Sequence, residues 1–93
     1  MKKITMLKMQ GCPYCAKALQ AIEELRAENP AYQNAEVECI DENEEPAKAK
    51  AYANDYYYLP SLFVEGKKIY EAHPGDDYDT IKAAVVKAFA AAK

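Results

Sequence analysis

The sequence is poor in the features that mark several functional classes. It has no tryptophan, one histidine and three cysteines, and its 12 basic residues are outnumbered by 15 acidic ones. Because nucleic-acid binders usually carry a basic patch, the net charge of -3 argues against that class. No apolar run approaches the roughly 18 residues that a membrane-spanning helix needs. We therefore expect neither nucleic acid nor a membrane among its partners.

The N-terminus lacks the pattern of a secretory signal. Lys2 and Lys3 are followed by no long apolar stretch, and lysine returns at Lys8. We therefore expect a cytoplasmic protein, in a compartment where structural disulfides are rare. The chain has no internal repeat or low-complexity linker, and its 93 residues suit one domain. We expect a single domain over residues 1–93 and a monomer.

The hydrophobic pattern predicts strands that alternate with helices. Strands are predicted over residues 3–9, 36–40, 59–64 and 67–70. Helices are predicted over residues 13–28 and 44–54 and from about residue 76 to the end. The order β-α-β-α-β-β-α implies a parallel β-α-β unit followed by an antiparallel hairpin. We therefore predict an α/β fold with a mixed four-stranded sheet flanked by helices.

The motif Cys12-Pro13-Tyr14-Cys15 lies where the first strand gives way to the first helix. Cysteines at this spacing can come close enough to form a disulfide. Cys12 is predicted at the start of the helix, where unpaired backbone N–H groups and the helix dipole stabilise a thiolate. Since thiolates attack disulfides, we predict that Cys12 attacks a substrate and that Cys15, one turn further and buried, resolves the mixed disulfide.

The same pair could instead be half of a zinc site or carry no chemistry. A structural zinc site normally has four ligands, and outside the pair the chain offers only Cys39 and His73, at a spacing that matches no zinc pattern. We therefore predict no metal site. Cys39 is predicted to be a small buried hydrophobe rather than a regulatory thiol, and His73 a solvated loop residue.

Cys-Pro-Tyr-Cys directly after a first strand resembles the active site of dithiol glutaredoxins, within the thioredoxin-fold superfamily. Leu59-Pro60 before a strand resembles that fold's proline, and the element order over essentially the whole chain is similar to the glutaredoxin form. The resemblance implies a cis Leu59–Pro60 bond that faces the cysteines, whereas the residues alone favour a trans proline. It also implies that the Leu59 backbone N–H and C=O bind an extended substrate segment.

The resemblance further implies where a substrate or glutathione would be contacted. These positions are Pro13 and Tyr14 between the cysteines and the segment Gly75, Asp76 and Asp77. Backbone N–H groups and a carboxylate of that segment could meet the amine of glutathione. The other interpretation of the same segment is a helix start with acidic capping residues.

Two positions depart from the glutaredoxin pattern and keep open a relative that works without glutathione. Glutaredoxins usually have Lys or Arg three residues before the first cysteine, but here Met9 stands there, and neighbouring Lys8 faces the other side of the strand. Glutaredoxins also usually have a Gly-Gly pair after the hairpin, where this chain has Tyr70-Glu71. The chain is no typical thioredoxin either, because no tryptophan precedes the cysteines.

The sequence thus predicts a thiol–disulfide oxidoreductase of glutaredoxin type. Its expected substrates are disulfide-containing proteins or glutathione mixed disulfides. We expect no bound cofactor, with glutathione as a possible co-substrate. The electron source would be a glutathione or thioredoxin reductase system. The alternatives are a thioredoxin-like donor independent of glutathione, a Cu(I) chaperone or an iron–sulfur carrier. Copper chaperones usually have Met two residues before the first cysteine, where this chain has Gln10, and Cys15 argues against the iron–sulfur carrier.

Of Tyr56, Tyr57 and Tyr58, some are expected in the core and one or two beside the cysteines.

Overall fold

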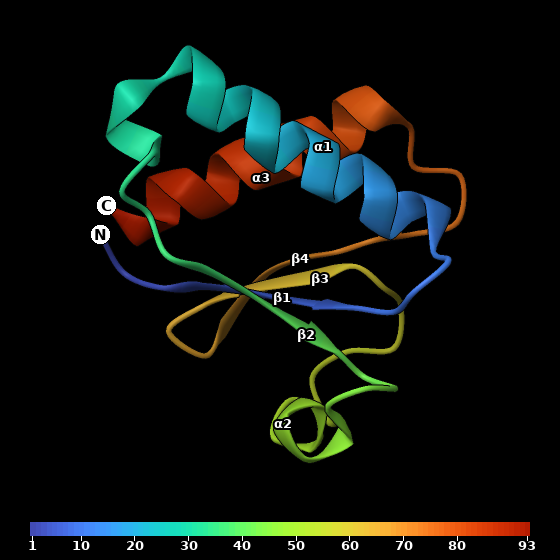
Figure 1. The fold of residues 1–93 in the computed structure, drawn as a ribbon. Helices are drawn as coiled ribbons and strands as arrows, with labels where there is room; N and C mark the ends of the chain where they lie inside the picture. Colours follow the sequence, from blue (N-terminus) through green and yellow to red (C-terminus); the bar gives the residue numbers. More distant parts are fainter.

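The computed structural model describes residues 1–93, in which a four-stranded sheet is flanked by helices (Figure 1). The strands are β1 (Ile4–Lys8), β2 (Val37–Asp41), β3 (Ser61–Val64) and β4 (Lys67–Glu71). The helices are α1 (Pro13–Glu28), α2 (Pro46–Lys50) and α3 (Tyr78–Ala92), with a 3₁₀ turn, η1, at Pro30–Tyr32. None of the helices combines the length and the apolar character needed to cross a bilayer. The predicted element order and the α/β class are confirmed.

The sheet has the strand order β2-β1-β3-β4. Strand β1 pairs in parallel with β2 and antiparallel with β3, and β3 and β4 form the predicted hairpin. The hairpin turns at Glu65 and Gly66, which both have positive φ angles. Strand β1 is central because its side chains are apolar on both faces: Met6 packs into one hydrophobic cluster and Leu7 into the other.

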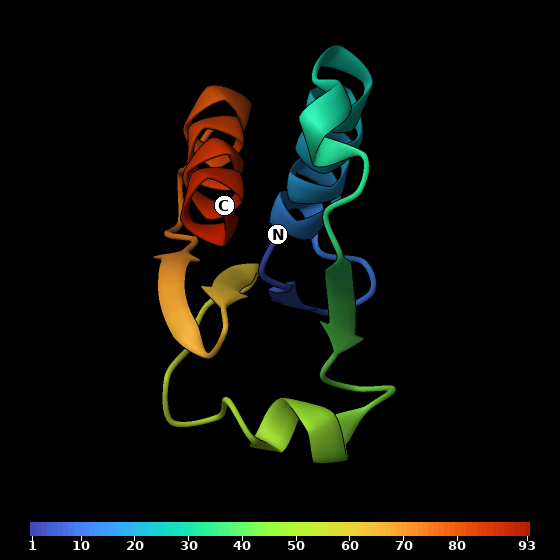
Figure 2. The same ribbon diagram turned by 90° about the vertical axis from the view of Figure 1, so that its left-hand side faces the viewer.

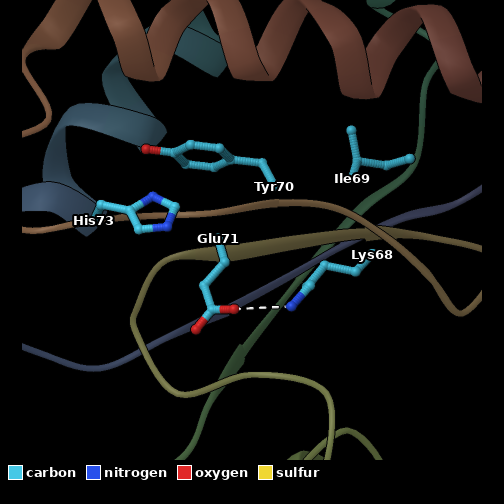
Figure 3. Close-up of a pocket in the computed structure, with 5 residues that line it drawn as sticks. All are labelled: Lys68, Ile69, Tyr70, Glu71 and His73. Carbon is cyan, nitrogen blue, oxygen red and sulfur yellow. Dashed lines mark hydrogen bonds and ion pairs between the residues drawn. The ribbon is translucent and has the colours of Figure 1, made fainter.

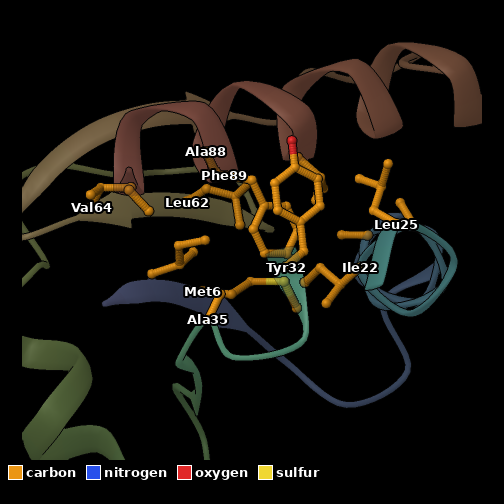
Figure 4. Close-up of a cluster of buried hydrophobic side chains, with 14 of the residues drawn as sticks. Met6, Ile22, Leu25, Tyr32, Ala35, Leu62, Val64, Ala88 and Phe89 are labelled. Atoms are coloured by element: carbon orange, nitrogen blue, oxygen red, sulfur yellow. The ribbon is translucent and has the colours of Figure 1, made fainter. Parts of the chain in front are cut away.

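The two faces of the sheet are covered unequally. Helices α1 and α3 lie side by side on one face, and α2 lies on the other (Figures 1 and 2). The main hydrophobic core fills the space between the sheet and the two long helices (Figure 4). Within it the rings of Tyr32 and Phe89 are stacked, with centroids 4.3 Å apart. A smaller cluster around Leu7 and Phe63 attaches α2.

The second helix is shorter than predicted. It begins at Pro46 rather than residue 44, since proline suits the first helical position and holds the preceding Glu45 outside the helical region, at φ -129° and ψ 58°. Beyond Lys50 the backbone continues as turns with bonds to the residue three back, such as Tyr52 N–H to the Ala49 carbonyl. Strand β3 also begins later than predicted, at residue 61. The 3₁₀ turn η1 was not predicted.

Candidate active site

Cys12 is the residue that caps the N-terminus of α1, as predicted. Gly11 precedes it with φ of 81°, a conformation that glycine adopts at little cost, and Pro13 follows at the first helical position. The Cys12 Sγ accepts a hydrogen bond from the backbone N–H of Cys15 at 3.2 Å. That N–H belongs to the first turn, where no carbonyl is available, so the sulfur lies at the positive end of the helix dipole.

Cys15 lies behind Cys12 on the buried side of α1. It is 2% exposed, against 9% for Cys12. Burial raises the pKa of the Cys15 thiol well above its ordinary value, so that this thiol keeps its proton at neutral pH. No disulfide joins the pair, and both are free thiols. One sulfur thus reaches the surface at the helix start, while the other is protonated and covered.

The Leu59–Pro60 segment faces the cysteine pair. Its peptide bond is cis, as the resemblance implied, and the trans alternative is wrong. The Cys12 thiol donates a hydrogen bond to the Leu59 carbonyl, with 3.7 Å between sulfur and oxygen. The backbone N–H of Leu59 makes no hydrogen bond within the chain. A backbone acceptor therefore contacts the sulfur, and the backbone donor of the same residue is free.

A groove of about 350 Å³ opens beside Cys12. Its walls are residues 9 and 11–14 around the start of α1, Glu42 just after β2, and residues 57–59 before the cis proline. It contains Pro13, Tyr14 and Leu59 of the predicted substrate contacts. Cys15, Pro60 and the segment 75–77 are absent from the walls.

The groove carries no lysine or arginine side chain. Met9 lines it, while the Nζ of neighbouring Lys8 lies 3.8 Å from Oδ2 of Asp41 on the adjacent strand. Hydrogen bonds from backbone N–H groups, first that of Asn43, hold the pKa of the buried Asp41 carboxyl below its ordinary value. Lys8 therefore faces a buried carboxylate outside the groove, as its place on the strand predicted.

Tyr14 joins the start of α1 to the loop that precedes α3. Its hydroxyl oxygen accepts a hydrogen bond from the backbone N–H of Gly75 at 2.8 Å. Lys17 lies over the Tyr14 ring, with its Nζ 5.5 Å from the ring centroid. The structure thus brings Gly75 to a residue of the groove wall, but its N–H is already bonded within the protein.

Asp76 and Asp77 bind their own loop and helix. The Asp76 carboxylate accepts hydrogen bonds from the Tyr70 hydroxyl and the His73 backbone N–H, and chiefly the former lowers its pKa. Asp77 caps α3 by accepting the backbone N–H of Thr80 at 2.8 Å. The interpretation as a helix start is therefore confirmed. A contact of these two residues with a substrate stays a prediction.

The three consecutive tyrosines divide between core and groove. Tyr56 packs against the smaller hydrophobic cluster, and its hydroxyl donates to Oε1 of Glu42 at 2.8 Å. Tyr57 and Tyr58 line the groove and are 83% and 42% exposed. Their rings meet edge to face, with centroids 4.9 Å apart. Two of the three are thus at the groove, within the range expected.

The groove wall is held in place by Glu71, for which the sequence predicted no such role. Its Oε2 accepts the backbone N–H groups of both Tyr57 and Tyr58 at 2.7 Å. Its Oε1 forms an ion pair with Lys68 at 2.9 Å (Figure 3). These contacts lower the pKa of Glu71 to about 2, with the Tyr58 N–H as the largest cause. No sequence signal links residue 71 to residues 57 and 58, because the contact depends on the loop path.

Replacing Glu71 with glutamine is expected to lower the free energy of unfolding by about 1–2 kcal/mol at neutral pH, because hydrogen bonds to a charged acceptor are lost. The folded-state pKa lies below the ordinary 4.5, so this stabilisation is complete above about pH 4.5 and is lost as the pH falls toward 2. Thermal unfolding of wild type and Glu71→Gln across this pH range measures the stability difference between the two proteins. The two curves should converge in acid, and a constant gap would contradict the assignment. Glu23→Gln, at an exposed position of α1, is the control.

Comparisons with known proteins agree with the observed fold. The family model described as glutaredoxin matches residues 3–69, more than half of the chain. Among the solved structures that match is one described as "Structure of a malarial protein", at 10% identity with a TM-score of 0.59. The alignment covers 90% of this chain and 92% of that one, and at this identity it supports the fold alone. A search of the curated proteins found no match.

Proposed function

The chain belongs to the glutaredoxin family, and from this premise we propose that it is a thiol–disulfide oxidoreductase whose reacting thiols are Cys12 and Cys15. One observation carries the proposal: the Cys12 sulfur lies on the groove wall and accepts the Cys15 N–H at the start of α1. A sulfur in this place lines the groove that a substrate would enter and accepts a backbone hydrogen bond that an attacking thiolate would keep. Family membership supports the reaction class, and the geometry supports the assignment of the two roles.

In the first step the Cys12 thiolate attacks one sulfur of a substrate disulfide. A new S–S bond joins Cys12 to that sulfur, the substrate S–S bond breaks, and the second substrate sulfur leaves as a thiolate. Ionisation of Cys12 also removes its hydrogen bond to the Leu59 carbonyl. That carbonyl and the unpaired Leu59 N–H are then both free to pair with an extended substrate backbone.

In the second step Cys15 resolves the mixed disulfide. Its buried thiol gives up its proton, which the leaving substrate thiolate takes, and its sulfur attacks Cys12. The Cys12–Cys15 disulfide forms and the bound substrate leaves as a thiol. The substrate disulfide has gained two electrons and two protons: one proton comes from Cys15, and the other, equivalent to the one that Cys12 lost, reaches the first leaving thiolate from solvent. The enzyme must then be reduced again by an external partner.

The electron source is either glutathione with its reductase or a thioredoxin-reductase-type partner. The groove walls contain no lysine or arginine to bind the carboxylates of glutathione, which favours the second source. Glutathione remains a candidate co-substrate, with disulfide-containing proteins or glutathione mixed disulfides as substrates. We propose these roles for a monomeric single domain in the cytoplasm.

The proposal is tested by following NADPH consumption during reduction of a mixed disulfide. One assay supplies glutathione and glutathione reductase, and the other supplies thioredoxin reductase. We expect sustained turnover in at least one assay, and the assay that works identifies the electron source. Failure of both, together with no stoichiometric oxidation of the Cys12–Cys15 pair by a disulfide, would contradict the proposal. An absorption spectrum of anaerobically purified protein tests the copper and iron–sulfur alternatives.

A further inference from the structure

We propose that Glu42 makes the groove selective for polypeptide disulfides in which a lysine or arginine neighbours the reacting cysteine. Anionic disulfides, glutathione disulfide among them, would react more slowly. The inference rests on the proposed function only in taking Cys12 as the thiol that reacts. It concerns the chemistry of the substrate, which family membership leaves open.

Glu42 is the one charged side chain on the groove walls. It is half-buried, and its Oε1 accepts the hydroxyl hydrogen of Tyr56 at 2.8 Å. No lysine, arginine or histidine forms an ion pair with it, and its Oε2 makes no hydrogen bond within the chain. One oxygen thus fixes the carboxylate in place, while the other is available to a ligand.

Asp41 and Glu45, two of the neighbouring acidic residues, have cationic partners, while Glu44 is unpaired but exposed to solvent outside the groove walls. Asp41 faces Lys8, and Glu45 forms an ion pair with Lys48 at 3.1 Å. Lys17 lies over the ring of Tyr14, a wall residue, but is not itself on the groove walls. Glu42 thus has no ion-pair partner and no cationic side chain lines the groove with it, so the groove walls favour cations over anions.

The exposed tyrosines that line the groove also favour cations. Tyr57 and Tyr58 present aromatic rings at the groove, and aromatic faces attract the ammonium or guanidinium groups of lysine and arginine. A carboxylate without an ion pair and two aromatic rings in one groove form a cation-binding environment. The unpaired Leu59 N–H nearby pairs with a peptide backbone, so the occupant that fits is an extended peptide with a basic side chain.

The experiment measures how fast Cys12 forms a mixed disulfide, without any reductase. The Cys15→Ser, Cys39→Ser double variant makes Cys12 the only thiol and stops the reaction at this stage. Its substrates are two peptide disulfides that differ only in the residues beside the cysteine, arginine in one and glutamate in the other. Each rate is divided by the rate of the same disulfide with mercaptoethanol, which removes differences in leaving-group reactivity.

We expect the arginine peptide to react at least about fivefold faster than the glutamate peptide at low salt, and the ratio to fall as salt screens the charge. Glu42→Gln, which keeps an acceptor for Tyr56, should reduce the ratio several-fold. Glu44→Gln removes the same charge from an exposed position outside the groove walls and should change the ratio much less. An unchanged ratio in Glu42→Gln, or an equal fall in both variants, would overturn the inference.

The outcome is separable from that of the proposed function. Stoichiometric exchange between Cys12 and a disulfide occurs whether or not a reductase system sustains turnover. If the protein discriminates by charge but never turns over, the role of Glu42 in the groove is supported and the proposed activity is contradicted. If the protein turns over without a charge preference, the proposed activity is supported and the role of Glu42 is contradicted.

Discussion

Replacing Cys12 with serine is expected to reduce disulfide turnover to the uncatalysed background, a loss of several orders of magnitude. A serine hydroxyl is not ionised by the helix N-terminus at neutral pH and is a poor nucleophile toward sulfur, so the first S–S bond cannot form. The Cys12 sulfur is also the one that lies on the groove wall. The measurement is the rate of disulfide reduction with whichever reductase system supports the wild type.

Variants of the other two cysteines give the matched controls. Cys15→Ser should form a mixed disulfide at Cys12 that mass spectrometry detects, and should turn over only when an external thiol resolves it. Cys39 is half-buried on β2, where burial raises the pKa of its thiol, so Cys39→Ser should leave turnover unchanged. Wild-type rates in Cys12→Ser, or a complete loss in Cys39→Ser, would show that the roles are assigned wrongly.

Replacing Phe89 with alanine is expected to destabilise the fold by about 3–5 kcal/mol, the usual cost of emptying a fully buried phenylalanine site. Phe89 is 0% exposed and stacks on Tyr32, so its ring joins α3 to the segment after α1. Small domains are stable by only about 5–15 kcal/mol, so this loss is a large share of the total. Urea unfolding followed by circular dichroism measures the change.

The control for Phe89→Ala is Val86→Ala on the same helix. Val86 is 39% exposed, and its truncation should change the free energy of unfolding by no more than about 0.5 kcal/mol. Both variants should unfold with the wild-type dependence on urea concentration if the denatured state is unaffected. A loss below 1 kcal/mol in Phe89→Ala would mean that the core closes around the missing ring.

Local patterns predicted most of the architecture. Helix α1 begins and ends at the predicted residues, because Pro13 and the Asn29-Pro30 pair mark its ends and its apolar residues recur at helical spacing. Strand β1 was recognised as central from apolar residues on both faces. The helix α2 was overestimated because its alanines and lysines have high helix propensity, while the observed turns pack Tyr52 on Phe63.

The candidate site also has some features that could be predicted from the sequence and others that could not. The position of Cys12 at the start of α1 could be predicted, since the cysteine, the proline and the helix start are adjacent in the chain. The hydrogen bonds from the Tyr57 and Tyr58 backbone to Glu71 could not be predicted. Neither could the hydrogen bond from the Gly75 N–H to the Tyr14 hydroxyl. These contacts join residues 13 to 61 positions apart, and no local preference encodes them.

By itself, then, the sequence determined the element order, the place of the two thiols at a helix start and the chemistry open to them. Helix propensity, capping and hydrophobic periodicity act over a few residues, and such local signals are sufficient to determine these properties. Only the tertiary structure decided which groups surround Cys12. Distant chain segments meet there because the whole core packs together. That packing leaves Glu42 without an ion pair in the groove and places Lys8 next to Asp41.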